Sequence, residues 1–204
     1  MEKKFILTDK FVINSFGIKL FQIKCTKSFK YAQKGDFGGY VEKEGNLDQE
    51  NDAWVFGNAR VFGNARVSSN ARVFGNARVS GDAWVSGNAR VFGNARVSSN
   101  AWVFGNARVF GDAWVSGNAR VSGDADIEND NEHCGFDGFG SCNRHTHAYM
   151  TKEKKVEIIC GCFRGSIEEF EKKVEETHSG TVYEKQYKSI INVIKIKFGL
   201  TDFT

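Results

Sequence analysis

A branched aliphatic residue recurs every six positions between residues 55 and 127, and an alanine stands two positions before each one. A period of six does not fit the turn of about 3.6 residues in an α-helix, whereas residues two apart project to the same side of a β-strand. Pairs such as Gly-Asn and Gly-Asp follow, and they supply the backbone conformations of a tight corner. The pattern predicts a solenoid of short strands, in which each unit buries its apolar side chains against the next.

This unit resembles the hexapeptide repeat of left-handed parallel β-helices, in which a small residue stands two positions before an aliphatic one. The resemblance implies a triangular prism with three units, or eighteen residues, in each coil. Val41 and Leu47 extend the pattern, each with a glycine two positions before it, and the eight-residue step from Leu47 to Val55 implies a two-residue insertion. Fifteen units predict about five coils, and we assign the β-helix to residues 39–130.

The segments on either side of the repeats predict caps. In residues 1–38, apolar and polar positions alternate as in three short strands (FILT, FVIN and IKLFQIK), which predicts an N-terminal β cap. After the repeats, GFGSCNRHTHAYMT and KKVEIICGCF are typical of paired strands. Ser166 and Glu169 form a capping box that begins a helix, and TVYEKQYKSIINVIKIKF predicts a second amphipathic helix. The chain is therefore expected to be mainly β, with a ββαα cap over residues 131–204.

Two stretches outside the repeats, KGDFGGYVEKEGNL and CGCFRGSIEEFEKKVEETH, are similar to a set of bacterial and phage hexapeptide-repeat proteins without an established activity. The similarity covers most of the chain. It implies the same architecture and an origin in a mobile element, and it implies no activity.

Stacking by eighteen residues sorts the outward positions into columns. On one face the residue after each core valine is a phenylalanine: Phe56, Phe74, Phe92 and Phe110. An exposed apolar strip of this kind is typical of interfaces, so we predict a homo-oligomer, a dimer or a trimer, that forms through this column. A thirty-residue duplication, visible as VFGNARVSSNA at 61 and again at 91, is an alternative origin of the column.

The position before each core valine predicts a partner-binding surface. It carries two arginine columns and a tryptophan pair: Arg72, Arg90 and Arg108; Arg60, Arg78 and Arg96; Trp84 and Trp102. Stacked like charges repel, which favours interleaved anions or a polyanionic partner, and arginines with aromatic rings can bind nucleic acid. The alternative is that these side chains keep the prism soluble and pack against the flanking segments.

Composition narrows the function classes. The net charge of +3 on 204 residues gives no global attraction to nucleic acid, although the repeats hold eight arginines against four aspartates. Five cysteines without a framework spacing favour reduced thiols in a cytoplasm. We expect neither a secretory signal nor a membrane-spanning segment.

Residues with candidate chemistry gather in the C-terminal segment: His133, Cys134, Cys142, His145, His147, Cys160 and Cys162. Their types suit zinc, but their spacings on expected strands do not, so no metal or cofactor is expected. Cys160 with His147 is an alternative nucleophilic pair. The β-helix resemblance also suggests an acyltransferase, but the repeats contain no histidine and no inserted loop.

The sequence therefore predicts a non-enzymatic, cytosolic binding or scaffold protein, which binds a macromolecular partner and no membrane, and for which a small-molecule substrate is not expected. The alternative is a phage-type protein that inhibits a host defence complex by binding a host protein or a protein–nucleic acid complex.

Overall fold

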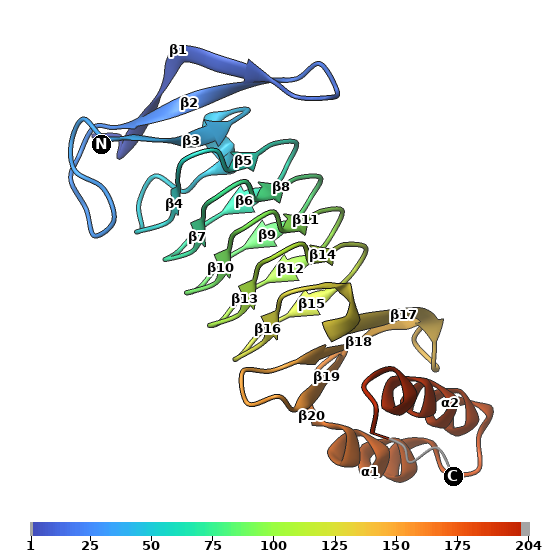
Figure 1. The fold of residues 1–204 in the computed structure, drawn as a ribbon. Coiled ribbons are helices and arrows are strands. Elements are labelled where there is room, and N and C mark those ends of the chain that lie inside the picture. Colours follow the sequence, from blue (N-terminus) through green and yellow to red (C-terminus); the bar gives the residue numbers. More distant parts are fainter. Residues whose placement is uncertain (1, 201–204) are drawn as a thin grey trace.

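Thirteen two-residue strands wind through the middle of the computed structural model, which describes residues 2–200 (Figure 1). They are β4 (Trp54–Val55), β5 (Arg60–Val61), β6 (Arg66–Val67), β7 (Arg72–Val73), β8 (Arg78–Val79), β9 (Trp84–Val85), β10 (Arg90–Val91), β11 (Arg96–Val97), β12 (Trp102–Val103), β13 (Arg108–Val109), β14 (Trp114–Val115), β15 (Arg120–Val121) and β16 (Asp126–Ile127). Each strand pairs in parallel with a strand one coil away, as Val73 pairs with Val91. The expected β-solenoid of about five coils is confirmed.

The coils form three faces, which we name after their outward residues. The Phe face is β4, β7, β10, β13 and β16; the Arg face is β5, β8, β11 and β14; the Trp face is β6, β9, β12 and β15. Inside, the alanine and the aliphatic residue of every unit are at most 3% exposed. Because each apolar side chain meets its equivalents in adjacent coils, the core continues along the whole axis.

The geometry of the corners explains why most units contain a glycine. Gly93 has φ +70°, and a Cβ on it would lie 2.9 Å from the backbone nitrogen of Gly111 in the next coil. Ser69 and Ser99 adopt the same left-handed conformation at equivalent corners, both with φ 58°. Coil spacing at the corner, together with the backbone conformation, therefore favours glycine.

The predicted two-residue insertion is confirmed. Val41 in β3 (Phe37–Val41) pairs with Val61, and Leu47 bridges to Val67, so both steps are twenty residues rather than eighteen. A short 3-10 turn, η1 (Glu44–Asn46), lies between them. The buried Asn46 amide donates to the carbonyls of Gly63 and Ala65 at 3.1 and 2.9 Å, which holds this turn on the coil beneath it.

The N-terminal cap has fewer strands than expected. FILT and FVIN belong to one strand, β1 (Phe5–Ile13), which pairs with β2 (Lys19–Cys25), and β2 pairs with β3. The prediction of three short strands in residues 1–38 is wrong, because the polar residues Asp9 and Lys10 lie within an irregularity of β1 rather than ending it. The hairpin extends the Arg face beyond the first coil (Figure 1).

The C-terminal cap holds both expected helices, α1 (Ile167–His178) and α2 (Val182–Lys197). Its sheet has four antiparallel strands rather than the expected pair: β17 (His133–Phe139), β18 (Arg144–Met150), β19 (Val156–Cys160) and β20 (Phe163–Ser166), after the 3-10 turn η2 (Asp130–Glu132). Tight turns with positive φ at Asn143, Lys154 and Gly161 divide each expected segment. One side of this sheet packs on the helices, and the other covers the last coil (Figure 1).

Candidate functional site

The structure brings the four predicted phenylalanines together in one column. The rings of Phe74 and Phe92 stack with their centroids 4.7 Å apart and 3° between their planes, and those of Phe92 and Phe110 stack at 5.0 Å and 7°. Phe56 meets Phe74 edge to face, with a centroid distance of 6.4 Å. The rings are half-buried rather than fully exposed. The strip is therefore less exposed than predicted, because each ring covers part of the next and Arg108 lies over the last two.

The predicted arginine columns also stack in register. Arg90 lies between Arg72 and Arg108 on the Phe face. Arg108 bonds to Asp126 at 3.1 Å, the one interleaved anion in this column, while Arg72 lies 4.9 Å from the ring of Tyr31. In the part of the chain that the structure describes, Arg90 makes no ion pair. Repulsion within the column is therefore relieved at its two ends rather than at its centre.

On the Arg face, Arg60, Arg78 and Arg96 occupy one column. Arg96 lies over the ring of Trp114 at 5.9 Å, and Arg60 and Arg78 make no ion pair with any described residue. This column therefore presents two uncompensated guanidinium groups along one side of the solenoid.

The tryptophan pair lies at the centre of the Trp face, between Arg66 and Arg120. Trp84 and Trp102 are 5.0 Å apart, the Trp84 indole N–H donates to Ser68 at 2.8 Å, and Arg120 lies 5.3 Å from the Trp102 ring. The face thus combines aromatic rings with cations at successive levels.

Asparagine columns at the corners are a feature that sequence reasoning assigned to turn geometry alone. Asn76 donates its side-chain amide to Asn94 at 3.3 Å, and Asn94 donates to Asp112 at 3.1 Å. A carboxylate accepts but does not donate, so each run of amide donors ends where aspartate replaces asparagine. The recurrence of Asn every eighteen residues is the feature of the sequence that could have predicted these columns.

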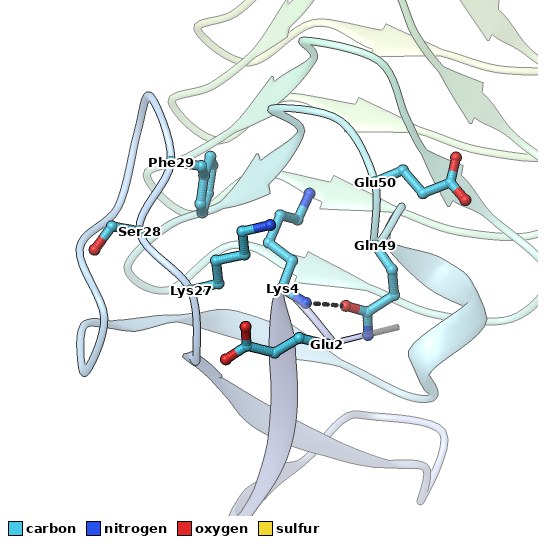
Figure 2. Close-up of a pocket in the computed structure, with 7 residues that line it drawn as sticks. All are labelled: Glu2, Lys4, Lys27, Ser28, Phe29, Gln49 and Glu50. Carbon is cyan, nitrogen blue, oxygen red and sulfur yellow. Dashed lines mark hydrogen bonds between the residues drawn. The ribbon is translucent and has the colours of Figure 1, made fainter.

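A cavity of about 430 Å³ lies at the N-terminal end, lined by Glu2, Lys4, Lys27, Ser28, Phe29, Gln49 and Glu50 (Figure 2). Lys4 is 4% exposed, and its ammonium donates to the carbonyls of Asn51 and Ala53, the latter at 3.0 Å. Burial lowers the pKa of Lys4 to about 8, against the opposing charges of Asp48 and Asp52. Because its ammonium donates to these two carbonyls, Lys4 attaches the N-terminal segment to the start of the first coil.

Histidines lie where the last coil meets the C-terminal cap. His147 is 1% exposed and its Nδ1 donates to the carbonyl of Arg120 at 2.9 Å, so its Nε2 accepts from His133 Nδ1 at 3.1 Å. Burial, reinforced by the neighbouring histidines, lowers the pKa of His147 to about 3. The ring is therefore neutral at physiological pH and connects the cap to the coil.

The alternative pair of Cys160 with His147 is not assembled. The Cys160 thiol contacts Thr146 and Tyr187 on the helix side of the cap sheet, whereas His147 faces the coil. Cys160 pairs with Thr146, and His147 is the next residue on that strand, so its side chain points to the opposite face of the sheet. The Cys160 thiol and the His147 ring therefore lie on different sides of the sheet. In residues 2–200, no three His, Cys, Asp or Glu side chains gather in a group that could hold a metal ion.

The most exposed large apolar side chains lie outside the predicted columns. They include Phe11, Ile13 and Phe16 of the N-terminal hairpin, Trp114 of the Arg face, and Val182, Val193, Ile196 and Leu200 at α2 and just beyond it. The amphipathic pattern predicted which side of α2 is buried, but it did not predict that Val182, Val193 and Ile196 of the same helix are exposed. None of the helices within residues 2–200 combines the length and the apolar character that a membrane span requires.

Comparison with protein families agrees with this architecture. The YdcK beta-solenoid repeat model matches five segments, residues 53–70, 71–87, 83–99, 89–104 and 101–117. These segments lie within the coils and include neither cap. No curated protein matches the chain. The solenoid is therefore similar to the YdcK beta-solenoid repeat over residues 53–117.

Proposed function

We propose that this is a non-enzymatic scaffold protein whose solenoid pairs with a second copy through the Phe face. The observation that carries the proposal is the nearly parallel stacking of Phe74, Phe92 and Phe110, which aligns their open edges in one straight apolar strip. Aligned apolar edges on a rigid support are suited to a flat protein interface. The proposal retains the assignment to left-handed hexapeptide-repeat proteins of bacteria and phages, made from the repeat and the flanking stretches.

Charge on the Phe face favours a second copy as the occupant. Arg72, near the N-terminal end of this face, makes no ion pair, and neither does the exposed Glu128 at the C-terminal end, among the residues that the structure describes. An antiparallel two-fold arrangement centred on β10 places Glu128 of each chain within one coil of Arg72 of the other. A two-fold interface uses the same patch on both chains, so it needs this self-complementarity.

Light scattering tests the proposal with Phe74→Glu and Phe92→Glu in one chain. We expect the wild type to have twice the 22.8 kDa mass of the chain and the variant to be monomeric. Phe62→Glu with Phe104→Glu is the matched control, because these phenylalanines hold the same repeat position on the other two faces. A wild type that is monomeric, or a control that dissociates equally, would contradict the proposal.

The Trp face favours a second candidate function, which is the binding of an anionic host macromolecule by a phage-type inhibitor. The supporting observation is the placement of Trp84 and Trp102 between Arg66 and Arg120 on one face. Pull-down from a bacterial lysate at low salt is expected to recover a specific partner that Trp84→Ala with Trp102→Ala loses. Trp114→Ala, on the Arg face, is the control, and equal recovery with both variants would contradict this role.

Acyl transfer is not proposed. The histidine nearest the coils, His147, is 1% exposed and both of its ring nitrogens have protein partners. A general base must reach the proton that it removes, and in this arrangement His147 does not reach a substrate.

A further inference from the structure

A cavity of about 320 Å³ lies where the last coil meets the C-terminal cap, separate from the Phe face. Its polar lining comes from Asn118, Arg120, Asp137, Asn143, Arg144 and His145, and Ile159 and Gly161 complete it. The volume is at the lower end of the range for small-ligand pockets, roughly 300 to 1,000 Å³. The solenoid and the cap each contribute one arginine.

Both arginines are held in place without a carboxylate. Within residues 2–200, neither Arg120 nor Arg144 makes an ion pair. Arg120 rests on the Trp102 ring at 5.3 Å. Arg144 lies across Gly161, where an added Cβ would come within 2.7 Å of its Cδ and Nη1 atoms. Stacking and close packing thus position the two guanidinium groups and leave their hydrogen-bonding capacity available.

The carboxylate in the cavity wall, Asp137, is already occupied. One of its oxygens accepts from His145 Nδ1 at 2.8 Å and from the Asn118 amide at 3.2 Å. These bonds lower the pKa of Asp137, so it stays ionised and bound to its two donors. Asp137 is therefore held by His145 and Asn118, and it makes no ion pair with either arginine of the cavity among the described residues.

In three other cavities, cations that line the wall already have partners within the protein. In the hollow beside Arg90, Arg108 bonds to Asp126 at 3.1 Å and Lys152 approaches Asp124 at 3.7 Å. Ion pairs such as Lys195 with Glu171 cross the groove between α1 and α2. In the N-terminal cavity, the Lys4 ammonium is bonded to backbone carbonyls.

We propose that the junction cavity binds a small phosphate-bearing ligand, with Arg120 and Arg144 as its anion-binding residues. Guanidinium groups bind phosphate through paired N–H donors, and two of them match a dianion better than a single carboxylate. Asn143 lines the same wall, and the Asn118 amide has one N–H besides the one that it donates to Asp137. The site is independent of self-association and lies beyond the Phe face.

Calorimetric titration tests the site with inorganic phosphate and phenyl phosphate, at constant ionic strength and pH 7.5. We expect saturable binding of at least one of them, weakened at least tenfold by Arg120→Gln and by Arg144→Gln. Tighter binding of phenyl phosphate identifies an ester ligand, and tighter binding of inorganic phosphate identifies the free ion.

Arg66→Gln is the matched control, because Arg66 holds the same repeat position as Arg120 at the other end of the Trp face. Tryptophan replaces arginine at this position in β9, β12 and β14, so the fold does not depend on a guanidinium there. Thermal unfolding of each variant checks that the cap remains docked. Absence of saturable binding, or equal weakening by Arg66→Gln, would overturn the proposal.

Discussion

The coils and the junction with the C-terminal cap bury apolar surface in different ways. In the coils, each valine packs on its own equivalents in adjacent coils, and backbone bonds repeat at eighteen-residue intervals. At the junction, single residues such as His147 and Tyr149 cover the last coil through contacts that occur once. Repetition therefore distributes stability over many equivalent positions, whereas the junction depends on individual side chains and their protonation.

The largest effect is expected from a charge in the coil core. Val91→Asp places a carboxylate at a position that is 0% exposed and has no cation beside it. Burial of an unpaired charge costs several kcal/mol, about 3 to 5 by comparison with broken buried ion pairs. We expect thermal unfolding by circular dichroism to show loss of the cooperative transition. Arg90→Gln, the outward neighbour, is the control and is expected to stay within about 0.5 kcal/mol of wild type.

The junction is expected to weaken in acid. The pKa of His147 is about 3 in the folded protein and 6.5 when it is unperturbed. Between these values the unfolded state binds the extra proton, so stability falls as the pH decreases, by at most about 1.4 kcal/mol per pH unit. Urea unfolding at pH 7, 6, 5 and 4 measures this slope.

His147→Gln removes the titrating ring and is expected to flatten that slope. His178→Gln, at the end of α1, is the control and should retain it. If both variants keep the wild-type slope, the acid sensitivity does not come from the junction.

Substitutions at the corners are expected to have a smaller effect. Two of them distinguish the cost of close coil spacing from the cost of the left-handed backbone conformation. Gly93→Ala introduces a left-handed alanine and a contact of 2.9 Å with the next coil, whereas Gly117→Ala, with φ +66°, meets nothing within 4 Å. The left-handed conformation alone costs about 1 to 2 kcal/mol. Thermal unfolding should therefore show a greater loss for Gly93→Ala, and equal losses would mean that the coils adjust freely.

The smallest effect is expected in the asparagine columns. Asn94→Asp removes the donor to Asp112 and places two carboxylates side by side. We expect a loss of about 0.5 to 1 kcal/mol at pH 7, smaller near pH 3 where carboxylates are protonated. Asn58→Asp, at the start of the column, has no neighbouring carboxylate in that column and is the control. An unchanged difference between the two at pH 3 would exclude charge repulsion.

Much of the solenoid could be predicted from the sequence because its contacts repeat. The six-residue period predicts the strands, and stacking by eighteen places Phe74 on Phe92 and Trp84 on Trp102. The same reasoning predicts which arginines are neighbours, but not how far an adjacent ring or Asp126 offsets their charge.

The caps were less predictable because their contacts are not repeated. A hydrophobic pattern does not distinguish a hairpin from a single long strand when the turns are as short as those at Asn143 and Gly161. It also does not indicate that His147 faces the coil while Cys160 faces the helices. Arg144 and Arg120 line one cavity because of how the cap docks, which no local pattern specifies.

Site-specific crosslinking tests the pairing of Phe faces most directly. A cysteine at position 90, on the Phe face, is introduced into a chain in which the exposed Cys142 and Cys162 are replaced by serine. A short thiol crosslinker is expected to join two chains through position 90, and to give no such product for a cysteine at position 66 on the Trp face. Crosslinking at position 66 but not at position 90, or at neither, would contradict self-association through the Phe face.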